Sequence, residues 1–201
     1  MKSRGEGMFE PEYRVGFRVL RQEVGLGDTF RIVIPAVLKS LVATHKAQAN
    51  SEEHEKRKAR IKNHFKLLAF MYRGLQRRYG ASRANEIVRE ILMKGGQAFF
   101  RGFTPLDPGV DLRRFAQIYK DFESHNIVFE VIEESRHRFE IVVRRCLIYE
   151  SFNELGLADL TQWMCDIAFA YFSNYHPRMK YSKDRMIARG DDTCHEVFAW
   201  E

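Results

Sequence analysis

The sequence of 201 residues is poor in cysteine, in proline and in long hydrophobic runs. Its 3 cysteines are too few, and odd in number, for a disulfide framework, so free thiols in a reducing compartment are expected. With 5 Pro, 45% hydrophobic and 30% charged residues, the chain is neither collagen-like nor disordered. Apolar runs such as Lys66–Tyr72 fall far short of the ~20 residues of a membrane span. The start, MKSRGEG, has no hydrophobic signal core. We therefore expect a cytoplasmic protein without a membrane partner.

Positive charge is concentrated in the first half of the chain. The net charge is +6, with 20 Lys/Arg and 10 Asp/Glu in residues 1–100 but 13 and 17 in residues 101–201. The cations of the expected helix 51–79 could follow a nucleic-acid backbone or form the solvated face of a core helix. We favour the solvated face and expect no nucleic-acid partner. These cations are Lys56, Arg57, Lys58, Arg60, Lys62, Lys66, Arg73, Arg77 and Arg78.

The first half contains residues that are typical of helix starts and helix ends. Asp28 precedes an apolar-periodic stretch that runs to about Ala49, and a second stretch opens at Ser51 and ends at Gly80. Ser82 and Asp111 are the expected caps of helices 83–94 and 112–124. The stretch 102–109, GFTPLDPG, is the most loop-like and could border a pocket.

The hydrophobic period changes at Asn126. Residues 127–134 and 137–145 alternate between apolar and charged, which predicts a hairpin, and residues 157–175 return to a helical period. A second hairpin is expected over 180–189 and 193–200. The prediction is one α+β domain over 1–201, with helices in 1–125 packed on a four-stranded antiparallel sheet of ββαββ order in 126–201.

The three cysteines all fall in the ββαββ part. Cys146, Cys165 and Cys194 could share a pocket at one rim of the sheet, although inert packing is common for cysteine. Asp166 lies in an otherwise apolar helix and needs a partner, either a cation such as Arg145 or Arg185 or a cationic ligand.

Residues 190–198, GDDTCHEVF, form the densest cluster of reactive side chains. On a strand, Cys194, Glu196 and Phe198 share one face and His195 lies on the other. Since Phe198 resembles a core residue, Glu196 is expected to point inward and His195 outward. The spacing includes neither a zinc motif nor a phosphate-binding glycine motif, so no metal and no cofactor are expected.

Four short segments together resemble the L-2-amino-thiazoline-4-carboxylic acid hydrolase family. They are 145–149 (RCLIY), 154–156 (ELG), 163–166 (WMCD) and 187–194 (IARGDDTC), and the resemblance covers about residues 140–198. It implies a fold related to small-molecule-binding domains of the 4-vinyl reductase type. The chain departs from the family pattern at Ala168, where an acid is frequent, and at Glu196, where an aromatic residue is frequent.

The resemblance implies a hydrolase that opens a cyclic amidine, as in the conversion of 2-amino-thiazoline-4-carboxylate to N-carbamoyl-cysteine. Asp166 is then the candidate to hold the planar amidinium, and Glu196 to activate water or protonate the leaving sulfur. Cys194 or Cys165 could attack as a thiolate if a nearby cation lowers its pKa.

The remaining binding groups and partners follow from the same hypothesis. The residues expected to bind the substrate are Arg145, Arg185 and Cys146, the arginines through a substrate carboxylate. The partner is a small-molecule substrate, and the oligomeric state is open, a homodimer included. The alternative is a binding module of the same fold that holds its ligand unchanged.

Overall fold

The computed structural model describes residues 11–48, 51–103 and 109–201. Two long helices open the chain: α1 spans Pro11–Val42 and α2 spans Glu53–Phe103. Each is bent at a glycine with a positive φ, Gly25 at 75° and Gly80 at 79°, a conformation that side chains other than glycine disfavour. Gly80 has non-helical φ and ψ, so the helix expected to end at Gly80 does end there, and a second helix of α2 follows directly.

The second helix of α1 starts just after Gly25, so Asp28 lies in its first turn, and the Asp28 side chain also joins the two long helices. Its carboxylate accepts hydrogen bonds of 2.7 and 2.6 Å from the guanidinium of Arg78, and another from the hydroxyl of Tyr79. The bonds from Arg78 and Tyr79 lower the pKa of Asp28 to about 2. This contact lies close in sequence to both bends, so it holds the bent parts of α1 and α2 together.

The second half contains the expected sheet. Its strands are β1 (Ile127–Glu134), β2 (Arg138–Cys146), β3 (Met179–Arg185) and β4 (Cys194–Trp200). All neighbouring pairs are antiparallel, and the order in the sheet is β1-β2-β4-β3. The α+β class and the ββαββ order are therefore confirmed.

The connection between the two hairpins is more divided than expected. In place of one helix over 157–175, the chain forms α4 (Leu147–Glu154), a 3-10 turn (Ala158–Leu160) and α5 (Thr161–Phe172). Gly156, at φ 71°, separates α4 from that turn. Periodicity alone missed α4 because its eight residues follow β2 without a break.

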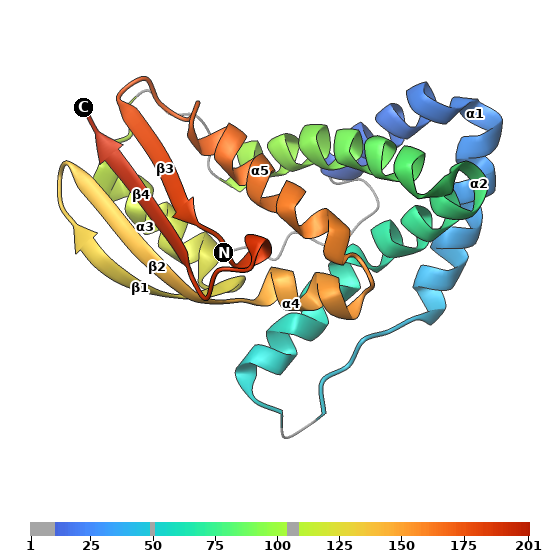
Figure 1. Ribbon diagram of the computed structural model, residues 1–201, viewed down its shortest axis with the longest axis horizontal. Helices are drawn as coiled ribbons and strands as arrows, with labels where there is room; N and C mark the ends of the chain where they lie inside the picture. Colours follow the sequence, from blue (N-terminus) through green and yellow to red (C-terminus); the bar gives the residue numbers. More distant parts are fainter. Residues whose placement is uncertain (1–10, 49–50, 104–108) are drawn as a thin grey trace.

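Two helices cover the inner face of the sheet, while α1 and the bend of α2 lie at the other end of the molecule and the last part of α2 runs back to α5 (Figure 1). The covering helices are α5 and α3 (Leu112–Glu123), and α3 is capped as expected by Asp111, which accepts from the backbone N–H of Arg114 at 2.8 Å. Helices α1 and α2 pack on each other, and α2 also packs on α4 and α5.

Aromatic rings fill the space between α3, α5 and the sheet. Phe115 and Tyr119 of α3 lie with ring centroids 4.9 and 5.1 Å from that of Phe198 on β4, and Phe172 of α5 lies 5.7 Å from Phe198. Most of the expected loop 102–109 lies outside the described residues. Among the described helices, none combines the length and the apolar character that crossing a membrane requires.

Candidate functional site

A large cavity lies where the two long helices meet the α5 side of the sheet. Its volume is about 1340 Å³, and its wall includes residues from α1 to α5 as well as from β3 and β4. Cavities that bind small molecules typically measure about 300–1,000 Å³. The cavity is therefore larger than a small ligand needs.

The inner end of the cavity contains a buried ion pair with two tyrosines. Lys183 of β3 lies opposite Glu196 of β4 in the strand register, and its Nζ is 2.7 Å from Oε1 of Glu196, with both side chains 7% exposed. The hydroxyls of Tyr119 and Tyr181 donate to Oε2 of Glu196 at 2.8 and 3.0 Å. The inward orientation expected for Glu196 is confirmed, and three donors compensate its burial.

These contacts change the acidity of the partners of Glu196. Burial lowers the pKa of Lys183, but the charge and hydrogen bond of Glu196, together with the nearby Cys165 and Cys194, outweigh burial, and the net shift is upward. Burial and the negative charge of Glu196 raise the pKa values of Tyr119 and Tyr181 well above their usual range. At neutral pH Lys183 is therefore a cation, and the hydroxyls of Tyr119 and Tyr181 are neutral.

A second buried carboxyl group, that of Glu123 at the end of α3, also lines the cavity. Burial raises its pKa from 4.5 to about 7, repulsion from Glu196 adds to that rise, and Asn126 and Lys183 oppose it. A carboxyl group that titrates near neutrality can both donate and accept a proton under physiological conditions. Glu123 therefore has the acidity of a general acid or base.

Two of the three cysteines reach the cavity. Cys146 and Cys165 line it, whereas Cys194 is buried outside its wall, with Sγ accepting from the backbone N–H of Ile187 at 3.3 Å. Cys146 caps α4, its Sγ 3.4 Å from the backbone nitrogen of Tyr149. Burial raises the pKa of Cys146 to about 12 and also raises the pKa values of Cys165 and Cys194. All three are protonated thiols at neutral pH.

The other residues expected in the site lie elsewhere. Asp166 is half-buried on α5 but is absent from the described wall of the cavity. Arg145 forms an ion pair with Glu150, and Arg185 is exposed at the end of β3. None of these three therefore contacts the inner end of the cavity in this structure.

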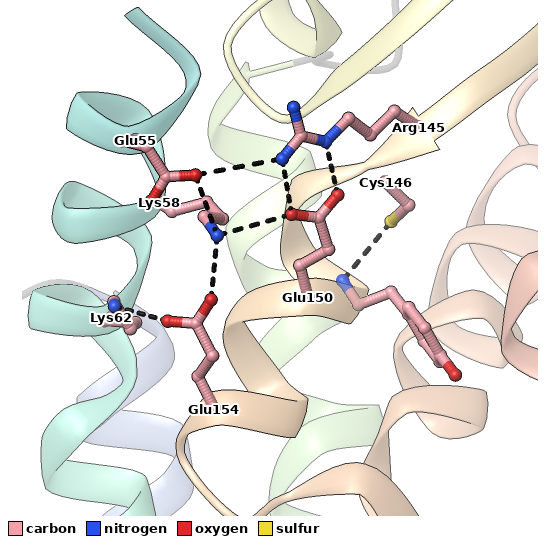
Figure 2. A network of polar contacts seen from close by, with 8 residues as sticks. Glu55, Lys58, Lys62, Arg145, Cys146, Glu150 and Glu154 are labelled. Atoms are coloured by element: carbon pink, nitrogen blue, oxygen red, sulfur yellow. Dashed lines mark hydrogen bonds and ion pairs between the residues drawn. The ribbon is translucent and has the colours of Figure 1, made fainter. Parts of the chain in front are cut away.

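Arg145 belongs instead to a network of charges that joins α2 to α4 (Figure 2). Lys58, only 9% exposed, lies 3.0 Å from Glu55, 3.4 Å from Glu150 and 2.8 Å from Glu154. Burial lowers the pKa of Lys58, but the hydrogen bond to Glu154 and the other acids produce a net rise. Part of the basic face of α2 is thus paired within the protein.

His195 lies on the outer face of the sheet, as its place in the strand predicted. Its Nε2 and Nδ1 are each 2.8 Å from a carboxylate, that of Glu140 and that of Asp184 respectively. The hydrogen bond with Glu140 raises the pKa of His195. Among the described residues, no group of three or more His, Cys, Asp and Glu side chains is placed to hold a metal ion.

Sequence reasoning missed Tyr119, Glu123, Tyr181 and Lys183. The sequence did contain a signal for Tyr181 and Lys183. Met179, Tyr181 and Lys183 of β3 face the core, so the strand has a cation at a position where its alternation predicts an apolar residue. Glu123 had no comparable signal, because it ends a helix in a polar stretch.

The fold is of the α+β class, and a large, partly open cavity lies between the long helices and the sheet. Comparison with protein families matches residues 58–198 to the L-2-amino-thiazoline-4-carboxylic acid hydrolase family. The chain belongs to that family, as the four short segments predicted. A search of curated proteins finds no match.

The comparison with solved structures gives only distant similarity. One match is a structure titled for the function of heme distortion in the H-NOX family, with 10% identity, TM-score 0.37, and coverage of 96% of this chain and 94% of that one. Another is an oxygen-binding H-NOX domain related to soluble guanylate cyclases, with 11% identity, TM-score 0.35, and coverage of 94% and 92%. At these scores the likeness supports no inference about a ligand.

Proposed function

We propose that this protein is a hydrolase that opens a cyclic amidine, such as a 2-amino-thiazoline ring, to a urea and a free thiol. The observation that carries the proposal is the wall of the cavity, which includes the buried carboxyl groups of Glu123 and Glu196 and the ammonium of Lys183. Membership of the hydrolase family supports the same reaction class.

Glu123 is the group that we assign to proton transfer. As a carboxylate it takes a proton from water while the water oxygen bonds to the amidine carbon. As a carboxylic acid it returns that proton to the sulfur when the carbon–sulfur bond breaks. The net reaction consumes one water, and Glu123 ends in its starting state. A pKa near 7 suits both steps, because the two forms of the carboxyl group are then close in free energy.

Lys183 is the group that we assign to binding a substrate carboxylate. An ammonium carries three N–H donors, so Lys183 can hold Glu196 and a second carboxylate together. Arg145 and Arg185, the anchors expected from sequence, lie away from the cavity wall, so Lys183 takes this role in the proposal. Glu196, which already accepts from three donors, then serves to position Lys183.

The cysteines have a smaller part in this mechanism than the sequence suggested. Cys165 lines the cavity, but burial raises its pKa, so the nucleophilic thiolate is scarce at neutral pH. We therefore favour water as the nucleophile, with Cys146 and Cys165 as part of the wall. Direct roles for Cys194 and Asp166 would require a rearrangement that brings them into the cavity.

The alternative function is a module that binds its ligand without changing it. The protonated thiols favour this alternative, since they leave the cavity without a strong protein nucleophile. The titratable Glu123 favours the hydrolase, because a buried carboxyl group with no chemical task would be replaceable by an apolar side chain.

The deciding experiment incubates the protein with a panel of 2-amino-thiazolines, including the 4-carboxylate, and measures released thiol colorimetrically. We expect turnover by the wild type and a loss of about 100-fold or more in kcat for Glu123→Gln, the usual range for a general acid or base. Cys165→Ser and Cys194→Ser are expected to stay within a few-fold of wild type.

Two results would contradict the proposal. If Cys165→Ser abolished turnover while Glu123→Gln retained it, the nucleophile would be a thiolate and the assignment of Glu123 would be wrong. If the wild type bound the rings but released no thiol from any of them, the binding module would be the correct function.

A further inference from the structure

The outer part of the cavity wall is mostly apolar, in contrast to its inner end, although the exposed Arg14, Arg18 and Arg21 also line the cavity. We define the outer chamber as the wall contributed by Phe30, Val33, Ile34, Val37, Leu68 and Met71, from α1 and α2. Phe30 and Ile34 are 46% and 54% exposed, whereas Glu123 and Glu196 are buried, so the chamber lies between the solvent and the polar end. Large apolar side chains grouped around a hollow commonly mark a binding surface.

The size of the cavity does not suit a small polar ring alone. The ring that names the family has one five-membered heterocycle with an amino and a carboxylate substituent, and the polar end accounts for those groups. The whole cavity measures about 1340 Å³, above the range of about 300–1,000 Å³ typical of sites for drug-sized ligands. A ring held by Lys183 would leave the outer chamber unfilled.

We propose that the substrate is an amphiphile, with a long or bulky hydrocarbon group in the outer chamber and its reactive ring at the polar end. The assignment of the ring rests on the proposed function, whereas that of the hydrocarbon group rests on the outer chamber. Burial of apolar ligand surface against apolar walls supplies affinity, and the polar end selects and orients the ring.

The binding experiment uses the full chain and the neutral fluorophore N-phenyl-1-naphthylamine, which brightens in apolar sites. We expect saturable binding and displacement by two homologous series, n-alkanols and 2-amino-thiazolines with n-alkyl substituents. Each added methylene should tighten binding about fourfold until the chamber is full, from the transfer free energy of a buried CH₂. Absence of fluorophore binding, or affinity independent of chain length, would overturn the amphiphile.

A pair of substitutions on α1 locates the hydrocarbon group. Val37→Trp fills the outer chamber and should weaken binding of the long-chain compounds at least tenfold, with little change for the shortest. Leu41→Trp is the control, because Leu41 is 72% exposed and lies outside the described wall. Equal effects of the two substitutions would overturn the location. The wild-type series tests the proposal even if Val37→Trp fails to fold.

Turnover separates the amphiphile from the hydrolase. If alkyl-substituted rings are opened with a higher kcat/KM than the unsubstituted ring, both proposals are supported. If no ring is opened but the alkanol series retains its chain-length dependence, the hydrolase is wrong and the apolar ligand group stands. If the unsubstituted ring is opened as efficiently as the substituted ones, the hydrolase stands and the amphiphile is wrong.

Discussion

The carboxyl group of Glu123 should make the stability of the fold depend on pH. Burial, with repulsion from Glu196, raises its pKa from 4.5 to about 7, so the folded state binds this proton more tightly than the unfolded chain does. The stabilisation is fully present below about pH 4.5 and is lost as the pH rises through 7. A rise of this size corresponds to about 3 kcal/mol, because one pKa unit is about 1.4 kcal/mol.

Glu123→Gln removes this proton equilibrium while it keeps the size and polarity of the side chain. Urea unfolding at pH 5, 6, 7 and 8 measures the free energy of unfolding of both proteins. We expect the variant to gain stability relative to wild type as the pH rises, by about 2.5 kcal/mol between pH 5 and pH 8. Other groups titrate equally in both proteins and cancel in the difference.

Glu86→Gln is the matched control, since Glu86 is exposed on α2 with a side chain 62% accessible. Its difference from wild type should change little with pH. The reasoning would be refuted if the difference between Glu123→Gln and wild type were as flat as that of the control. Glu123 would then ionise as easily in the fold as in the unfolded chain.

Two further predictions concern stability and are measured by urea unfolding. Lys183→Met should lower the free energy of unfolding by about 3–5 kcal/mol because it leaves Glu196 buried without its cation. Adding Glu196→Gln to this variant should recover part of the loss. Strictly additive effects of the two substitutions would contradict the buried pair. Gly96→Ala places a Cβ 2.6 Å from Cγ2 of Ile167 and should lower the free energy of unfolding by about 1–3 kcal/mol. The added Cβ of Gly27→Ala has no atom within 4 Å, so this substitution should leave the free energy of unfolding unchanged or raise it by up to about 1 kcal/mol. Similar losses of stability for the two glycine substitutions would contradict the close packing of α2 on α5.

The sheet was predictable because alternation is a local property of a strand. Residues 194, 196 and 198 share a face whatever packs on it, so the inward Glu196 and the outward His195 followed from the pattern alone. The helical boundaries were less predictable. Gly80 does end the first helix of α2, as its residue type indicated, but the helix expected over 83–94 extends to Phe103.

The candidate site was predictable only in part. The sequence identified Glu196, Cys146 and Cys165, and these do line the cavity, but Cys194 and Asp166 lie outside its described wall. Asp166 was expected to meet a cation or a cationic ligand, because an acid in an apolar helix needs a partner. A helix has several faces, however, and its sequence does not tell which of them borders a cavity.

By itself, the sequence determined the α+β class, the ββαββ order and the family, because these depend on periodicity and on short segments read along the chain. Only the tertiary structure decided which charged groups meet. Glu123, Lys183 and Glu196 come from α3, β3 and β4, and their acidity depends on burial and on one another's charge. Coulomb energies and desolvation depend on distances in space, so a site assembled from distant segments acquires its chemistry when the chain folds.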